Sequence, residues 1–161
     1  MFNISDTVIY GGSQLCVIAD IREECFTGTK MLYYILKPVY DKNSTVYHPV
    51  EGGEAKIRMP VSKEKAEKII TDTDFTVEWN AFDPLRKECF DGILKESDPE
   101  KLIGLIRLIS SKRTELAQNG KRLRAADEKA FNEARRAVSE ELAFALGTDK
   151  ECVTDMILGA D

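Results

Sequence analysis

One tryptophan and a group of cationic residues are the side chains of this sequence best suited to binding chemistry. Trp79 is the only tryptophan, and it lies between two segments that carry helix start signals. Its indole could stack on a base or wedge between base pairs, as apolar side chains do in the minor groove of DNA. It could equally pack inside a protein core. The residues around it leave both interpretations open.

Cations gather between residues 107 and 124, where six basic residues accompany a single acid. The basic residues are Arg107, Lys112, Arg113, Lys121, Arg122 and Arg124. Residues 125–161 have the opposite balance, with nine acids and four bases. This asymmetry favours a positive patch that contacts phosphates. The alternative is an ordinary solvated helix end, since cations are stabilised at helix C-termini.

Residues for metal or acid–base chemistry are sparse. His48 is the only histidine, so a Ser-His-Asp or Cys-His arrangement would have to use it. We expect His48 to be a surface or edge residue instead. The cysteines lack the paired spacing of a zinc site, and we expect them to be free, reduced and mostly buried: Cys16, Cys25, Cys89 and Cys152. We therefore predict no enzyme activity, no metal site and no cofactor.

The overall charge constrains any role on DNA. The 161 residues carry a formal net charge of −5, whereas a protein that grips DNA by itself is usually basic. A partner would have to bring this chain to DNA. No apolar run approaches the ~20 residues that span a bilayer, and residues 1–4 do not resemble the start of a secretory signal. We expect a cytoplasmic protein.

The first 60 residues predict short β-strands, because β-branched and aromatic residues alternate there with turn formers. The expected strands are residues 6–10, Gln14–Glu24, 30–37, 45–50 and 56–59. A period of two places four side chains on one face of the second strand: Leu15, Val17, Ala19 and Ile21. Five short strands would expose their edges as a flat sheet, so we predict a small five-stranded SH3- or Tudor-like barrel.

From Ser62 onward the apolar residues recur at helical spacing. Helix start signals stand at Ser62, Asp83-Pro84, Asp98-Pro99, about Asp127, and Asp149. Residues 71–76 break the first helix, and one stripe of the second should face the core: Leu85, Cys89 and Ile93. The predicted class is α+β with two domains, a barrel over residues 1–60 and a compact helical bundle over residues 61–161.

Pro49 lies inside the fourth expected strand. Because proline has no N–H to donate to a neighbouring strand, this strand or its end should lie at an edge of the sheet. The free backbone groups of an edge strand can pair with an extended segment of another chain. The fourth strand is therefore a candidate docking surface.

Several segments, in this order, resemble the CarD/CdnL family of bacterial transcription regulators. They are FNISDTVIY (2–10), VIADI (17–21), YYILKP (33–38), STVYHPV (44–50), Trp79, DE (127–128) and EELA (140–143). The same barrel occurs in the polymerase-binding module of the transcription-repair coupling factor. The resemblance implies that residues 1–60 bind the β subunit of RNA polymerase through an exposed strand. Residues 61–161 would meet promoter DNA at the upstream edge of the bubble, where a tryptophan wedge stabilises the open complex.

The resemblance, together with the excess of cations in residues 107–124, gives two expected sets of contact residues. The polymerase-binding set is Glu24, Thr45, Val46, Tyr47, His48 and Pro49. The DNA-binding set is Trp79, Arg86, Lys87, Arg107, Lys112, Arg113, Lys121, Arg122 and Arg124. The family often follows its tryptophan with two arginines, whereas this chain has Asn80-Ala81-Phe82, and we expect Arg86 and Lys87 to substitute. Tyr47 and Glu24 stand where some relatives carry a base.

A protein–protein adaptor is the alternative from a different functional class. In this interpretation a Tudor-like domain and a helical bundle bind protein partners without direct DNA contact, and Trp79 serves only in packing. The acidic net charge favours it. An indole protected from solvent would support the adaptor, and an exposed indole would count against it.

Overall fold

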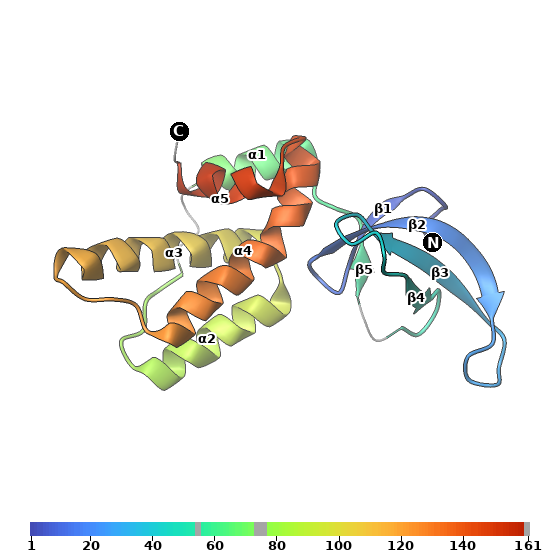
Figure 1. Cartoon of the computed structure of the whole chain (residues 1–161), viewed down its shortest axis with the longest axis horizontal. Helices are drawn as coiled ribbons and strands as arrows, with labels where there is room; N and C mark the ends of the chain where they lie inside the picture. The colour runs from blue at the N-terminus through green and yellow to red at the C-terminus, as the bar shows by residue number, and fades with distance from the viewer. Residues whose placement is uncertain (54–55, 73–76, 160–161) are drawn as a thin grey trace. The chain divides into compact units, whose positions relative to one another are not determined.

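The computed structural model of the chain describes residues 1–53, 56–72 and 77–159 (Figure 1). These residues form five strands followed by five helices, which confirms the predicted α+β class. Residue contacts divide the chain into two compact units, Met1–Pro60 and Val61–Asp161. Within the described ranges, no helix is both long enough and apolar enough to cross a membrane.

The strands form one antiparallel sheet in the order β4-β3-β2-β1-β5. Their bounds are β1 Thr7–Tyr10, β2 Gln14–Glu24, β3 Met31–Pro38, β4 Val46–Pro49 and β5 Ile57–Arg58. Over the part of the chain that the structure describes, the end strands β4 and β5 do not pair, so the sheet is open rather than closed as predicted. With four and two residues, they offer few ladder groups for closure. β4 lies at an edge, as Pro49 indicated.

A β-bulge in β2 changes which side chains face the sheet's core. The pairing of β2 with β3 shifts register between Ile18 and Asp20, which leaves Ala19 as the extra residue. Cys16 and Ile18 belong to the core, and after the bulge it is Ile21 that packs against it. The predicted face of β2 is therefore wrong, and Ala19 is exposed. A strict period of two cannot predict the face of Ile21, because the extra residue Ala19 reverses the alternation of the side chains that follow it.

His48 lies on the edge strand, but its side chain is buried and only 6% exposed. Its ring stacks on Tyr34 at 6.5 Å between centroids and meets Tyr10 edge-on at 5.8 Å. Of the two expected places, the edge position is confirmed, whereas a surface side chain is wrong because the alternation along β4 turns His48 inward and Tyr47 outward. The imidazole is a core aromatic of this unit.

Gly53 is expected to be intolerant of a side chain because it packs against the buried His48 ring. A Cβ atom there would lie 2.7 Å from both Cε1 and Nε2 of the imidazole. We predict that Gly53→Ala destabilises the sheet unit by about 1–3 kcal/mol, the usual cost of overpacking a core. Gly92→Ala is the control, since no atom lies within 4 Å of a Cβ added in that helix, and it should stabilise. Thermal melts that shift the same way for both variants would contradict this account.

The second unit contains α1 Lys63–Thr71, α2 Asp83–Glu96, α3 Pro99–Gln118, α4 Ala125–Leu146 and α5 Lys150–Leu158. Two predicted caps are present: the Ser62 hydroxyl accepts from the Lys65 N–H at 3.2 Å, and the Asp98 carboxylate accepts from the Glu100 N–H at 3.0 Å. α4 begins at Ala125, slightly before the predicted start. α1 ends at Thr71, and residues 73–76 of the predicted break lie outside the described residues.

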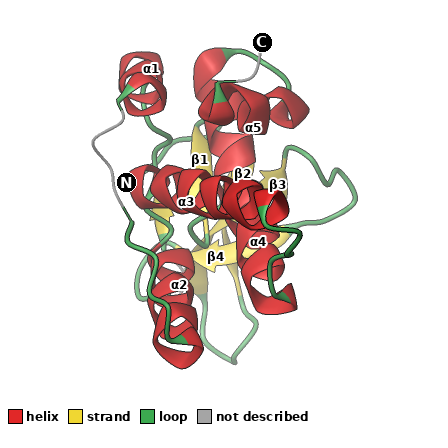
Figure 2. Cartoon of the chain, turned by 90° about the vertical axis from the view of Figure 1, so that its left-hand side faces the viewer, coloured by secondary structure: helices red, strands yellow, loops and turns green. Residues whose placement is uncertain are grey.

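α4 contacts each of the other four helices and forms the centre of the bundle. Figure 2 shows α1 and α5 on one side of α3 and α2 on the other. The largest side chains of this core are Phe90, Leu102, Ile103, Leu105, Ile106, Ile109, Phe131 and Leu142. Their burial from three separate helices, α2, α3 and α4, makes the bundle, rather than any single helix, the source of stability.

α2 turns a different face inward than the one predicted. Of the predicted stripe only Ile93 packs against the core; Leu85 and Cys89 are exposed, whereas Arg86 and Phe90 are buried. Apolar periodicity could not anticipate this, because a charged residue occupies a core-facing position and is neutralised by Asp127 of α4. The cysteine prediction is also wrong in part, since three of the four free cysteines are exposed: Cys25, Cys89 and Cys152.

Candidate nucleic-acid interface

Trp79 is partly buried at the edge of the helical core, just before α2. Its ring meets Phe90 edge-to-face, with centroids 6.0 Å apart and an interplanar angle of 65°. Two cations lie over the indole, with the guanidinium carbon of Arg86 4.3 Å and the Lys112 ammonium nitrogen 5.4 Å from its centroid. The indole is thus held by one aromatic ring and two cation–π contacts while keeping part of its surface in solvent.

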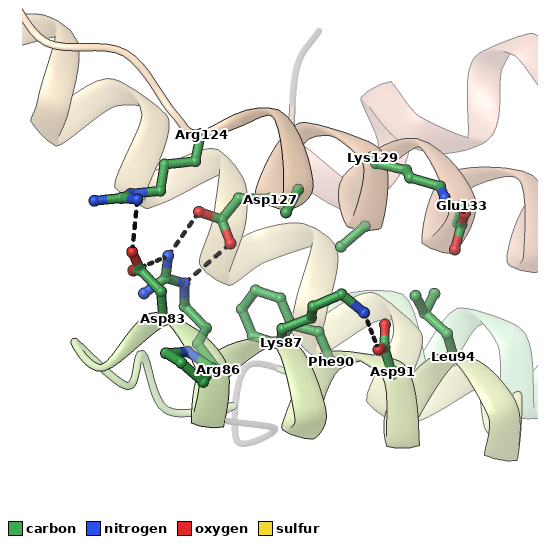
Figure 3. A pocket seen from close by; sticks show the side chains of 13 residues that line it. Asp83, Arg86, Lys87, Phe90, Asp91, Leu94, Arg124, Asp127, Lys129 and Glu133 are labelled. Carbon is green, nitrogen blue, oxygen red and sulfur yellow. Dashed lines mark hydrogen bonds and ion pairs between the residues drawn. The ribbon is translucent and has the colours of Figure 1, made fainter.

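Arg86 is the centre of a charge network that joins α2 to the start of α4 (Figure 3). Its Nε and Nη2 donate to the two carboxylate oxygens of Asp127 at 3.0 and 2.9 Å. Nη2 also pairs with Asp83 at 2.7 Å, and the other oxygen of Asp83 pairs with Arg124 at 2.8 Å. These four residues, Asp83, Arg86, Arg124 and Asp127, are called the Arg86 cluster below.

The burial of Arg86 argues against its predicted contact with DNA. The residue is 4% exposed, and its remaining Nη1 donates to the Asn80 carbonyl at 2.9 Å. Hydrogen bonding to Asp127 raises the pKa of the guanidinium above its ordinary value despite the opposing effect of desolvation. Arg86 is therefore a charged internal residue whose fork geometry is used on carboxylates inside the bundle.

Arg107 is likewise used inside the helical unit rather than on its surface. Its guanidinium donates to three backbone carbonyls, those of Ile70, Asp72 and Ile157. These bonds tie α3 to the end of α1 and to α5. Sequence reasoning grouped Arg107 with the cationic patch, but the structure satisfies its donors internally, so it is left out of the candidate interface.

The remaining cations of the predicted DNA-binding set lie at the surface. Lys112 pairs with Glu115, and Arg113 pairs with Glu128 while stacking over the Phe131 ring. Lys87 pairs with Asp91 one turn along α2. Such exposed pairs contribute little stability and exchange readily for other anions. They can therefore turn toward phosphates.

The loop between α3 and α4 presents the most accessible cations. The Lys121 N–H donates to the Leu116 carbonyl at 2.8 Å, and Gly120 adopts a positive φ of 69° that reverses the chain. Lys121 and Arg122 are exposed and form no ion pair with any residue that the structure describes. Arg124 is exposed as well and joins this loop to the Arg86 cluster through Asp83.

A groove of about 440 Å³ runs between α2 and α4 beside the Arg86 cluster (Figure 3). Its apolar lining comes from Pro84, Phe90, Leu94, Ala126 and Ala130. Its charged residues balance, since Lys87 pairs with Asp91 and Lys129 with Glu133. The groove therefore shows no preference for a ligand of either charge.

An aromatic patch lies at the outward face of the sheet beside the edge strand β4. Tyr47 is 40% exposed and Phe26 is 56% exposed, and their rings lie 5.1 Å apart. Phe26 also contacts Tyr33 at 5.1 Å and thus bridges from the β2–β3 turn across β3 to β4. Sequence reasoning missed Phe26. The available signal was a large aromatic residue inside a turn, which is otherwise polar.

The other predicted polymerase-binding residues differ in availability. Glu24 ends β2 and accepts from Arg22 at 2.6 Å, and that hydrogen bond raises the pKa of Arg22. Thr45 accepts from Lys37, whereas Val46 packs partly against the core. Pro49 is partly buried and the His48 side chain is buried, so His48 can offer only its backbone to a partner.

No protein-family model matches the chain, and no curated protein matches it significantly.

Proposed function

We propose that this chain is a non-enzymatic, CarD-like regulator that binds RNA polymerase and stabilises the open promoter complex. The observation that carries the proposal is the partly buried Trp79 with Arg86 and Lys112 over its ring. A partly exposed indole that is held just before α2 by Phe90 and two cations has the properties of a residue that stacks at an opened base step.

Exposed cations of the helical unit would supply the positioning part of this interface. Lys121 and Arg122 are exposed and available to phosphates, whereas Arg86 and Lys112 lie over the indole. Phosphate contacts fix the register of a protein on the duplex without reading sequence. They act here on an acidic protein of net charge −5, which cannot find DNA efficiently by itself. Polymerase would supply the missing affinity.

The sheet unit is proposed as the polymerase-binding module. Its strand order, a meander whose last strand returns to β1, fits an SH3- or Tudor-like small barrel in an open form. An extended segment of the β subunit would add to the free edge of β4 and pack on the patch of Tyr47 and Phe26. Backbone pairing supplies affinity in this mode, and the aromatic patch supplies selectivity.

Trp79→Ala is the variant that tests the DNA part of the proposal. Stacking on a base is worth roughly 1–3 kcal/mol, so the dissociation of open complexes should accelerate about five- to a hundredfold. The measurement is the lifetime of heparin-challenged complexes formed by the host polymerase with each variant. Phe144→Ala is the control, because it removes an exposed aromatic ring elsewhere in the helical unit.

Capture of the isolated β-subunit lobe separates the two halves of the proposal. Trp79→Ala should capture the lobe as well as the unmodified chain does. A normal open-complex lifetime in that variant would remove the wedge role. Failure of the unmodified chain to capture the lobe would remove the polymerase-binding role.

A protein–protein adaptor is the second candidate, and one observation favours it. Phe82, Leu85 and Cys89 form an exposed stripe at positions i, i+3 and i+7 along the outer face of α2. Such a stripe is typical of a helix face that meets a protein partner. Retained lobe capture together with an unchanged open-complex lifetime in Trp79→Ala would favour this function.

A further inference from the structure

We infer that Asp127 is a positioning residue for Trp79, acting through Arg86. This inference rests on the proposed function for its biological meaning, but its physical content concerns only the chain itself. Trp79 belongs to an irregular segment, so regular helix hydrogen bonds do not orient its side chain. Contacts made by its neighbours must do so.

Arg86 provides the first of those contacts, and it acts at two points of the segment. Its guanidinium covers the indole at 4.3 Å, and its Nη1 holds the Asn80 carbonyl directly after Trp79. The Asn80 side chain also accepts from the Phe82 N–H at 2.9 Å, which closes a turn before α2. Arg86 thus contacts both the ring and the backbone that follows it.

Asp127 fixes that side chain in turn. It receives two parallel hydrogen bonds from the guanidinium, and both partners are buried, so the plane of the Arg86 fork is set by α4. A guanidinium without this partner would be held only by the partly exposed Asp83 and by the Asn80 carbonyl, and it could turn out of its present plane. The cation–π contact with Trp79 would then be lost.

Asp83 connects Arg86 to the loop between α3 and α4, which carries Lys121 and Arg122 and is called the basic loop here. One of its oxygens pairs with Arg86 and the other with Arg124, the residue that leads from the loop into α4 (Figure 3). A phosphate that draws Arg124 away leaves Asp83 to Arg86 alone. Phosphate contact at the loop is thereby coupled to the residue that orients the indole.

Acrylamide quenching of the single tryptophan tests this inference without polymerase or DNA. In Asp127→Asn, the balance between a packed and a released indole should shift by about tenfold, as loss of a partly desolvated cation–π contact implies. The quenching constant should rise and the emission should move to longer wavelength. Asp83→Asn, at a partly exposed position, should fold in any case and give a smaller change in the same direction.

Glu96→Gln is the control, because it neutralises an exposed carboxylate at the far end of α2, the helix that begins at Asp83, and its partner there is Lys101. All measurements are made well below the melting temperature, with unchanged far-ultraviolet circular dichroism. If Asp127 only adds stability, its variant will melt earlier but quench like the unmodified chain, and the positioning role is overturned. Unchanged quenching in Asp83→Asn would overturn the link to the basic loop.

The quenching experiment and the open-complex experiment can fail separately. If Trp79→Ala leaves open complexes unaffected while Asp127→Asn exposes the indole, the proposed function fails and the positioning role stands. If Trp79→Ala shortens the open-complex lifetime but Asp127→Asn leaves the quenching of Trp79 unchanged, the proposed function stands and the positioning role fails. When both hold, Asp127→Asn should also shorten open-complex lifetime, by less than Trp79→Ala does, with lobe capture intact.

Discussion

Asp127→Ala is expected to lower the free energy of unfolding of the helical unit by about 3 kcal/mol, near the lower end of the range for breaking a buried ion pair. The cost arises because Arg86 remains buried and loses its bidentate partner. Asp83 still pairs with the guanidinium, which keeps the loss from being larger. Urea titration followed by Trp79 emission measures this unit directly, since the chain has a single tryptophan.

A double variant distinguishes the effect of leaving Arg86 without its ion-pair partner from the effect of losing side-chain packing at these two positions. Replacing both charges by apolar side chains of similar volume, Arg86→Met with Asp127→Leu, should cost much less than Asp127→Ala alone, because no uncompensated charge stays buried. Glu96→Ala should have little effect, since its partner Lys101 is exposed. An equal loss in the double variant would show that the pair is not the source of the stability.

Phe90→Ala is expected to be comparably damaging, at about 3–5 kcal/mol, through lost burial and the cavity it leaves. Phe90 is 2% exposed, lines the groove between α2 and α4, and supports the Trp79 ring edge-on. The variant should therefore also bring Trp79 emission closer to that of an indole in water. Urea titration and the emission spectrum of the folded variant measure the two effects separately.

Phe82→Ala is the matched control for Phe90, because the same substitution is made at the start of the same helix on a ring that is 61% exposed. Surface substitutions of this kind usually change stability by less than about 0.5 kcal/mol. Equal losses in the two variants would mean that the burial of Phe90 does not determine the stability of this region.

Local signals explain why most element positions could be predicted. The bounds of β2 agree with the predicted Gln14–Glu24, because alternating apolar residues end there at turn formers. Ser62 and Asp98 cap α1 and α3 as predicted, because a cap is satisfied by a backbone N–H two or three residues away. Both kinds of signal act within a few residues of the sequence.

The candidate site depended on contacts that no local pattern reveals. Arg86 and Arg107 read as surface cations, yet Asp127 and three backbone carbonyls, all distant in sequence, bind them internally. Phe26 and Tyr47 lie in separate segments and meet only once β3 has paired on both sides. Their proximity is a product of sheet assembly.

The sequence by itself therefore determined the class of the fold, the edge position of β4 and the presence of a single tryptophan and of a basic segment. Tertiary structure decided which cations serve the indole, which remain free for phosphates, and which aromatic residues form a surface. The physical reason is that the two kinds of interaction join residues at different separations along the chain. Caps, turns and apolar periods are satisfied by neighbours in the chain, whereas a buried charge must find a partner that only packing can bring to it.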